Sequence, residues 1–410
     1  MKSLDTSFVR QQFPAFAEPS LSGWGFFENA GGSYICEQVI NRLTTYLKQT
    51  KVQPYHAYPI AQKAGEAMDL SYSRLADYLN VSEDELHLGP STSQNTYVLS
   101  NAIRGLWQVG DEIIVTNQDH EANSGVWRKL EKDGLVVREW GVNAKSGLLD
   151  PKDLENLLSE KTRMVTFPQC SNIVAAWNPV KEINQIIHAS GAISIVDGVA
   201  AAPHGFPDVK EIGADIYLMS LYKTWGPHLG LMTIKRSLMD QLTNQGHYFH
   251  DDLTRKRLLP AGPDHGQIVA AKGIIDYQDT IYDHHFDASV SSQDRRRNVN
   301  KLFSAHENRL LMILLDWLKN RDDIRILGPD NAHGRAPTVS IWPLKKKVPE
   351  VHSALTDHKL MVGSAHFYAP RLLKAMNIPP EEGVLRMSFL HYTTEEEIYQ
   401  LIRGLSAALD

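Results

Sequence analysis

The sequence predicts an α/β protein with a large domain built on a mostly parallel sheet and a smaller α+β domain towards the C-terminus. Three observations predict this fold. From about residue 86, short apolar runs alternate with amphipathic stretches; these runs are nearly continuous in Val, Ile, Leu and Met; and the pattern changes after about residue 265. Continuous apolar strands separated by helices are typical of a mostly parallel sheet covered on both faces.

The expected elements of the large domain follow one another along the chain. We expect strands over residues 112–116, 135–140, 163–167, 192–196, 216–220 and 231–234, and helices over residues 121–132, from residue 150 onward and over 179–189. Asp150 and Pro151 begin the second helix, because aspartate caps helices and proline fits the first turn. Right-handed crossovers between parallel strands place their carboxyl ends at one edge, where ligands bind in such folds.

A different pattern follows residue 265. We expect a long helix over residues 289–319, strands over 338–342 and 384–389, and a closing helix over 394–409. The prediction is therefore a large domain over residues 21–265 and a small domain formed by residues 1–20 and 266–410.

Composition excludes several classes of protein. The 410 residues are 42% hydrophobic and 22% charged, with a formal net charge of −6, which argues against nucleic acid as the main partner. No apolar run approaches the roughly 20 residues that cross a bilayer, and the N-terminus has no secretory signal pattern. The two cysteines, Cys36 and Cys170, have no disulfide or zinc-site spacing. We expect a cytoplasmic protein that binds neither membrane nor nucleic acid and holds no metal.

Polar side chains stand just beyond the predicted strands. The residues in these positions are His120, Asn172, Asp197 and Lys223, and Thr92 and Ser93 stand where a helix must begin. A helix N-terminus with hydroxyls suits a phosphate, a partly desolvated lysine suits imine formation, and a carboxylate can hold a protonated pyridine nitrogen. Pyridoxal 5′-phosphate (PLP) requires these parts of a protein.

Each of these residues also has a purely structural interpretation. Lys223 could be a surface lysine, Asp197 a turn residue before Gly198, Thr92 and Ser93 a plain helix cap, and His120 a loop histidine. The strand and helix pattern alone predicts only an α/β enzyme with an anionic ligand.

Three stretches taken together carry a family resemblance. They are VDGVAAAPH (196–204), GADIY (213–217) and SLYKTWGP (220–227). Their order and spacing resemble the class V aminotransferase family, and within it the cysteine desulfurase-like branch, with similarity from about Phe27 to the C-terminal helix. The resemblance implies the fold type I of PLP-dependent transferases, and a homodimer with its active sites at the subunit interface.

The resemblance also implies cofactor roles, residue by residue. Lys223 matches the lysine bonded to PLP, Asp197 the aspartate paired with the pyridine nitrogen, and His120 the histidine stacked on the ring. These three are the expected catalytic residues. The other expected cofactor-binding residues are Thr92, Ser93, Asn172, Ser220 and Tyr222.

Four residues are expected at the substrate. Arg386 matches an arginine that clamps the substrate α-carboxylate, a task that its planar fork suits. Asn172 is expected beside both cofactor and substrate, and Asn29 is expected to line the pocket. Tyr368 stands at the place of a mobile cysteine in desulfurases.

The sequence departs from the desulfurase pattern at three places. Tyr222 replaces a histidine, although a phenol still donates to phosphate, and Pro263 replaces a threonine that reaches the partner subunit's phosphate. Residues 363–370 contain no cysteine, and a phenol cannot carry persulfide sulfur. Cys170 is interpreted as a buried structural cysteine.

The resemblance implies an enzyme acting on an amino acid. Lys223, once displaced by the substrate amine, would remove the α-proton. The favoured prediction is a cysteine desulfurase-like lyase that cleaves a C–S or related bond by β-elimination, without a persulfide cysteine. The alternatives are a class V aminotransferase, an amino-acid epimerase, or a protein that keeps the fold without catalysis.

Overall fold

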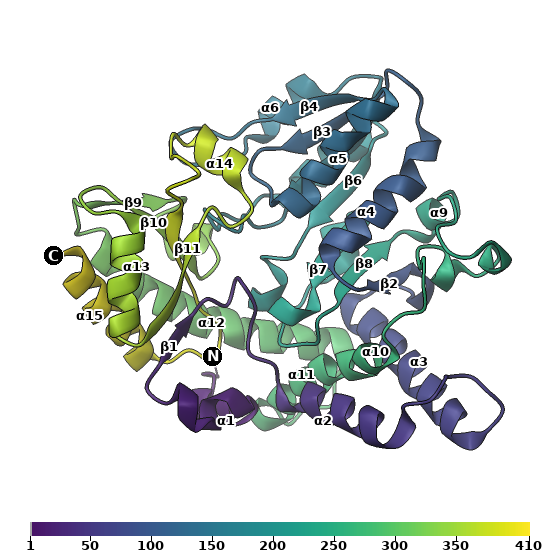
Figure 1. Cartoon of the computed structure of the whole chain (residues 1–410), viewed down its shortest axis with the longest axis horizontal. Coiled ribbons are helices and arrows are strands. Elements are labelled where there is room, and N and C mark those ends of the chain that lie inside the picture. Colours follow the sequence, from purple (N-terminus) through teal and green to yellow (C-terminus); the bar gives the residue numbers. More distant parts are fainter. Residues whose placement is uncertain (1) are drawn as a thin grey trace.

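The larger of two β-sheets lies in the upper right part of the molecule as drawn in Figure 1. The computed structural model describes residues 2–410. The seven strands of this sheet, in spatial order, are β2 (Leu86–Gly89), β8 (Gly230–Ile234), β7 (Ile216–Ser220), β6 (Ile193–Asp197), β5 (Thr162–Pro168), β3 (Glu112–Thr116) and β4 (Val136–Trp140). Strands β3 to β7 are parallel, whereas β8 pairs antiparallel with both β7 and β2. The predicted α/β class and the mostly parallel sheet are confirmed.

The central strands are buried on both faces, as their continuous apolar sequences predict. Ile195 packs in one hydrophobic cluster and its neighbour Val196 in another. Strand β7 alternates in the same way, with Ile216 and Tyr217 on opposite sides. Because successive side chains of a strand point to opposite faces, only a sheet covered on both sides can bury both sets.

The smaller sheet has five strands. In spatial order they are β1 (Gly25–Phe27), β11 (Leu360–Ala365), β12 (Val384–Ser388), β10 (Thr338–Pro343) and β9 (Ile324–Leu327). Helices α13 (Val348–Asp357) and α15 (Glu395–Leu409) pack beside it. The long helix α12 (Ser292–Leu318) joins the two cores, because Phe303 packs in the core of the large sheet and Leu314 in that of the small one.

The remaining α-helices surround these sheets (Figure 1). They are α1 (Thr6–Gln11), α2 (Glu37–Thr45), α3 (Pro59–Leu79), α4 (Thr92–Ile103), α5 (Gly125–Arg128), α6 (Pro151–Leu157), α7 (Val180–Ala189), α8 (Val209–Ile212), α9 (Arg236–Met239), α10 (His265–Ala271), α11 (Gly273–His285) and α14 (Pro370–Ala375). Within residues 2–410, no helix combines the length and the apolar character that a membrane span requires.

Two segments near the predicted domain boundaries pack across them. Strand β1, which the prediction assigns to the large domain, pairs with β11 of the small sheet. Helices α10 and α11, which it assigns to the small domain, pack against α2 and α3. The division at residues 20 and 265 therefore stays a prediction, with contacts that cross both boundaries.

One predicted element is wrong, because residues 121–132 do not form a single helix. The segment contains a 3-10 turn, the short helix α5 and a second 3-10 turn, with bounds Glu121–Asn123, Gly125–Arg128 and Lys129–Asp133. Nδ1 of His120 accepts a hydrogen bond from the Ala122 N–H at 3.0 Å, and Ser124 leaves the helical region with φ −124° and ψ −55°. This local side-chain capping competes with a continuous helix.

Candidate active site

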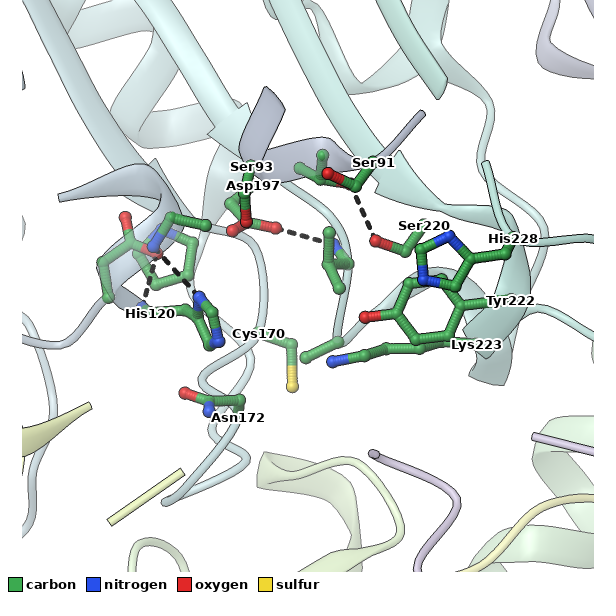
Figure 2. A pocket seen from close by; sticks show the side chains of 16 residues that line it. Ser91, Ser93, His120, Cys170, Asn172, Asp197, Ser220, Tyr222, Lys223 and His228 are labelled. Carbon is green, nitrogen blue, oxygen red and sulfur yellow. Dashed lines mark hydrogen bonds between the residues drawn. The ribbon is translucent and has the colours of Figure 1, made fainter. Parts of the chain in front are cut away.

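The polar side chains expected at the strand ends line one cavity (Figure 2). Asp197 ends β6, whereas His120, Asn172 and Lys223 follow β3, β5 and β7. The predicted residues on the cavity wall are Thr92, Ser93, His120, Asn172, Asp197, Ser220, Tyr222 and Lys223. They meet because parallel strands end at the same edge of the sheet.

Lys223 is held in a tight turn beyond β7. It ends the 3-10 turn Leu221–Lys223, and Trp225 follows in the left-handed region with φ 58°. The Trp225 N–H donates to Oγ of Ser33 at 2.9 Å. Burial, together with the nearby charge of Arg386, lowers the pKa of Lys223 to about 8, although Asp197 opposes both effects. A sizeable fraction of this amine is neutral near physiological pH, as a nucleophile or base requires.

Asp197 and Asp119 form a buried acidic pair. Oδ1 of Asp197 accepts a hydrogen bond from the Val199 N–H at 2.8 Å. Burial raises the pKa of Asp197 to about 6, although Val199 and Lys223 favour its charged form. Burial and the charge of Asp197 raise the pKa of Asp119 well above its usual value. Two neighbouring carboxylates resist ionising together. We therefore assign the proton to Asp119 and the negative charge to Asp197.

Hydroxyls and a helix N-terminus converge at one side of the cavity. Ser91 caps α4 by accepting from the Gln94 N–H at 3.2 Å, and Oγ1 of Thr92 lies 2.7 Å from Oγ of Ser220. Gly230 allows this close approach, because a Cβ there would lie 2.3 Å from the Thr92 nitrogen. Free N–H groups, hydroxyls and the positive end of the helix dipole suit a phosphate.

His120 presents an uncharged ring to the cavity. Burial and, to a smaller extent, the charges of Lys223 and Arg386 lower the pKa of His120 to about 3. Because Nδ1 accepts from the Ala122 N–H, the neutral ring carries its proton on Nε2. A flat neutral imidazole can stack on an aromatic ring.

Arg386 lies in β12 with its guanidinium almost entirely buried. Its Nη1 donates to the Asn172 carbonyl at 3.3 Å, its Cζ lies 3.7 Å from the centre of the Phe367 ring, and its Nη2 lies 3.7 Å from Oε1 of Glu28. Nε of Arg386 has no hydrogen-bond partner within residues 2–410. Burial lowers the pKa of Arg386 to about 10, so the group stays cationic at neutral pH. A buried cation with unused donors suits a carboxylate.

The loop that carries Tyr368 contacts residues that follow strands β3 and β5. The Tyr368 carbonyl accepts from the Glu121 N–H at 2.7 Å, and the Asn172 amide donates to the Phe367 carbonyl at 2.8 Å. Arg371 forms an ion pair with Glu121. Tyr368 is 66% exposed, and the centre of its ring lies 5.2 Å from that of the His120 ring. Tyr368 therefore stands beside His120 and not on the wall of the main cavity.

Asn29 lines a neighbouring small cavity that also contains Lys223. Its amide donates to the Ser388 carbonyl at 2.9 Å, and its Oδ1 accepts from the Tyr392 hydroxyl. The amide nitrogen and the amide oxygen of Asn29 therefore both form hydrogen bonds. These bonds hold the loop before α2 to residues at and just beyond the end of β12.

Cys170 has the environment of a structural cysteine. Its Sγ lies 3.2 Å from the Ala175 carbonyl, and burial raises the pKa of its thiol to about 12. A thiol with this pKa is neutral at physiological pH and is a poor nucleophile.

Several residues on the cavity wall were not predicted from the sequence. Ser91 could have been found from its position three residues before Gln94, a helix-capping spacing. Asp119 adjoins His120 but gave no separate signal. His228 stacks on Tyr222 with ring centres 4.7 Å apart, and only the turn between β7 and β8 brings it there.

Comparisons with known proteins identify the family of this chain. A family model described as "Aminotransferase class-V" matches residues 25–252 and 299–401. The chain is 32% identical over 416 residues to the aminotransferase-like protein FGM3 of Gibberella zeae, covering 98% of both chains. It is 26% identical to a cysteine desulfurase of Pectobacterium carotovorum, covering 97% of this chain and 96% of that protein.

Solved structures show the same fold. The crystal structure of the cysteine desulfurase CsdA from Escherichia coli superposes with a TM-score of 0.83 at 20% identity, covering 100% of this chain and 99% of that chain. A cysteine desulfurase from Thermococcus onnurineus gives a TM-score of 0.85 at 20% identity, with the same coverage. These likenesses confirm the predicted fold type I of PLP-dependent transferases. The chain is an enzyme of the class V aminotransferase family and belongs to its cysteine desulfurase-like branch.

Proposed function

We propose that this enzyme binds PLP and acts at the α-carbon of an amino acid, as a desulfurase-like lyase that works without a persulfide cysteine. The observation that carries the proposal is the convergence of Lys223, Asp197 and the Thr92–Ser220 hydroxyl pair on one cavity, with Arg386 nearby. PLP-dependence is a property of the family, and these donors fit the cofactor. The buried Oδ1 of Asn172, which has no partner within residues 2–410, leaves an acceptor free for it or for the substrate.

Each group in the cavity has a proposed task. PLP, when bound, supplies an electron-accepting ring. Thr92, Ser93, Ser220 and Tyr222 hold its phosphate, Asp197 keeps a negative charge at its ring nitrogen, and the neutral His120 stacks on the ring. Lys223 holds the cofactor covalently and, when free, takes the α-proton at Nζ.

The substrate is oriented by groups beside the cofactor cavity. Arg386 binds the α-carboxylate, which fixes the bond to be broken, and Asn172 lies beside cofactor and substrate. Asn29 positions the adjacent loop, and Tyr368 shields the mouth beside His120.

The absence of an accessible thiolate supports a lyase different from ordinary desulfurases. Residues 363–370 contain no cysteine, and the Cys170 thiol is neutral and buried. A β-substituent would therefore leave as a free species and not as a protein-bound persulfide. Transamination is the second candidate, because FGM3, at 32% identity, is described as aminotransferase-like; epimerisation shares the same proton removal.

A panel of amino acids tests the proposal on the holoenzyme. Pyruvate together with released sulfide or ammonia supports elimination, keto-acid formation that needs an acceptor supports transamination, and racemisation alone supports epimerisation. The visible band of the bound cofactor should disappear in Lys223→Ala and persist in the surface control His188→Ala. If the band is present but no amino acid perturbs it, the chain binds the cofactor without catalysis and the proposal fails.

A homodimer belongs to the same proposal, on the basis of the resemblance. An apolar cavity lined by Leu258, Pro260 and Pro263 adjoins His228 of the cofactor cavity. A second subunit over this face would exclude water from the cofactor site. Light scattering after size-exclusion chromatography measures the molecular mass, and a mass of 46.1 kDa would contradict the dimer.

A further inference from the structure

A carboxylate lies beside the cation that is proposed to bind the substrate. Oε1 of Glu28 is 3.7 Å from Nη2 of Arg386, a distance at which the charges attract but no hydrogen bond forms. Glu28 therefore balances the charge of Arg386 without using its N–H donors. The Glu28 side chain is 38% exposed and the Arg386 side chain 4%, so the carboxylate is the member of the pair that solvent reaches.

The sheet fixes Glu28 in this place. Glu28 directly follows β1 and forms a backbone bridge with Ser388, two residues beyond Arg386 in β12. Gly363 of β11 stands opposite Arg386 in the register of the sheet. A Cβ at Gly363 would lie 2.5 Å from Oε1 of Glu28. The missing side chain thus leaves the room that the carboxylate occupies next to Arg386.

The main cavity offers no second cation to a substrate carboxylate. Among the described residues that line it, none is an arginine, and its one lysine is Lys223, which is assigned to the cofactor. Arg371, which follows the loop of Tyr368, is already paired with Glu121. The lining also includes the buried acidic pair, which adds negative charge. An amino acid therefore meets one fixed cation, Arg386, and that cation already has a carboxylate beside it.

We propose that Glu28 is a specificity-determining residue, which makes the enzyme reject amino acids with an acidic side chain. The inference rests on the proposed function, with the α-carboxylate of an amino acid bound to Arg386. The side-chain carboxylate of aspartate or glutamate then lies within about 12 Å of Glu28, whichever way the side chain points, and the Debye length at low ionic strength exceeds this distance. Like charges repel each other at this range, whereas a neutral or cationic side chain is not repelled.

Two pairs of nearly isosteric amino acids test the proposal on the holoenzyme at low ionic strength. Aspartate is compared with asparagine, and glutamate with glutamine, since each pair exchanges a carboxylate for an amide of similar shape. The dissociation constants come from calorimetry and from changes in the cofactor absorption. The wild-type protein should bind the amide member of each pair about tenfold more tightly than the acid.

Glu28→Gln removes the charge and keeps the shape of the side chain. This variant should bind aspartate and glutamate about tenfold more tightly than the wild type, and the amides by no more than about threefold more tightly. Glu131→Gln, a control at an exposed position in the turn after α5, should keep the wild-type preference. A gain of affinity separates this role from a purely structural one, because a damaged site would lose affinity for every ligand.

The failures are distinguishable. If no amino acid binds to the wild-type holoenzyme, the proposed function fails. This inference alone is overturned if the wild type binds acid and amide equally well, if Glu28→Gln keeps the wild-type preference, or if the preference falls only because the amides bind more weakly. Should Glu28→Gln fail to load the cofactor, Glu28→Ala takes its place with the same expected gain. If neither variant loads it, Glu28 serves the fold and the inference is also overturned.

Discussion

The depressed pKa of Lys223 gives a quantitative prediction for cofactor attachment. Burial and the charge of Arg386 lower this pKa from 10.5 to about 8. At pH 7.5, about a quarter of such amines are neutral, against about one in a thousand for an ordinary lysine. Because only the neutral amine attacks an aldehyde, Lys223 should capture PLP roughly two hundredfold faster than an ordinary lysine at this pH.

The assay mixes cofactor-free protein with PLP over a series of pH values. Borohydride fixes the bond after a short interval, and mass mapping of peptides locates and counts the tagged lysine. The tag on Lys223 should reach half its maximal rate near pH 8. Arg386→Met should move this midpoint upward, because it removes a positive charge, whereas Asp197→Asn should move it downward, because it removes a negative charge.

Lys235→Met is the matched control, since Lys235 is a surface lysine paired with Asp215 at 2.7 Å. It should leave the midpoint unchanged. A midpoint above about pH 10, or a tag on another lysine, would refute the reasoning about the buried amine.

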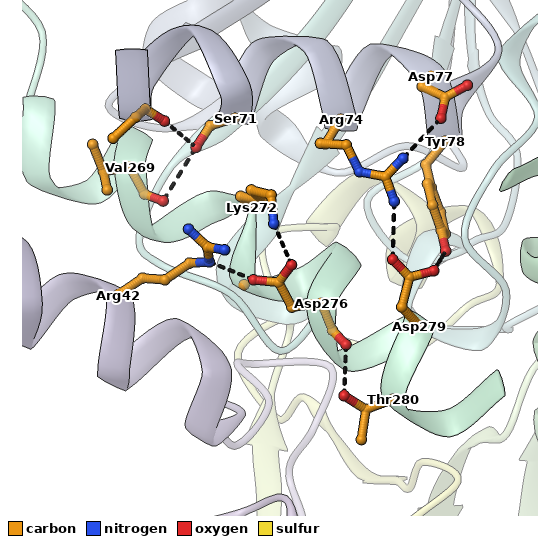
Figure 3. A network of polar contacts seen from close by, with 12 residues as sticks. Arg42, Ser71, Arg74, Asp77, Tyr78, Val269, Lys272, Asp276, Asp279 and Thr280 are labelled. Atoms are coloured by element: carbon orange, nitrogen blue, oxygen red, sulfur yellow. Dashed lines mark hydrogen bonds and ion pairs between the residues drawn. The ribbon is translucent and has the colours of Figure 1, made fainter. Parts of the chain in front are cut away.

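Three further outcomes follow from particular contacts. Thr92→Val keeps the shape of the side chain but removes one hydroxyl from the proposed phosphate site. Equilibrium dialysis should therefore show that PLP binds about tenfold more weakly. Unchanged PLP binding would contradict that site. Arg371→Ala removes the ion pair with Glu121. The rate of amide hydrogen exchange in the loop over residues 366–371 should then rise by up to about fivefold. An equal exchange rate would mean that the ion pair does not hold the loop. Asp279→Ala removes a carboxylate from the network that joins α3 to α11 (Figure 3). This carboxylate accepts a hydrogen bond from Arg74 at 2.9 Å and another from the Tyr78 hydroxyl. Urea unfolding should show a loss of about 1–3 kcal/mol, and no loss means that solvent replaces these contacts.

Periodicity in the sequence predicted the central sheet well. The strands over residues 112–116 and 216–220 have the predicted bounds, because a strand buried on both faces needs an apolar residue at almost every position. Strand β1 was not predicted: its three residues are too few to show a pattern, and its partners lie at residues 360–362. The helix predicted over residues 121–132 was wrong because the hydrogen bond that His120 Nδ1 accepts from the Ala122 N–H fixes a different local backbone.

Some residues of the candidate site could be predicted from the sequence, whereas other contacts in it could not. Lys223 and Asp197 could be predicted because a strand end and a family motif both mark them. The contact of Glu28 with Arg386 has no local signal, since Glu28 directly follows β1 and Arg386 lies in β12. The hydrogen bond from the Asn172 amide to the Phe367 carbonyl spans 195 residues, and only the tertiary packing brings the two together.

The amino-acid order by itself determined the α/β class, the edge of the sheet that carries the polar residues, and the lysine most suited to hold an aldehyde. These features depend on neighbours within a few residues, where periodicity and motif spacing act directly. Tertiary structure decided the ionisation of Lys223, Asp197 and His120, the position of the Tyr368 loop, and the small cavity beside Asn29. Desolvation and charge depend on which distant segments pack around a group, and no local pattern encodes that arrangement.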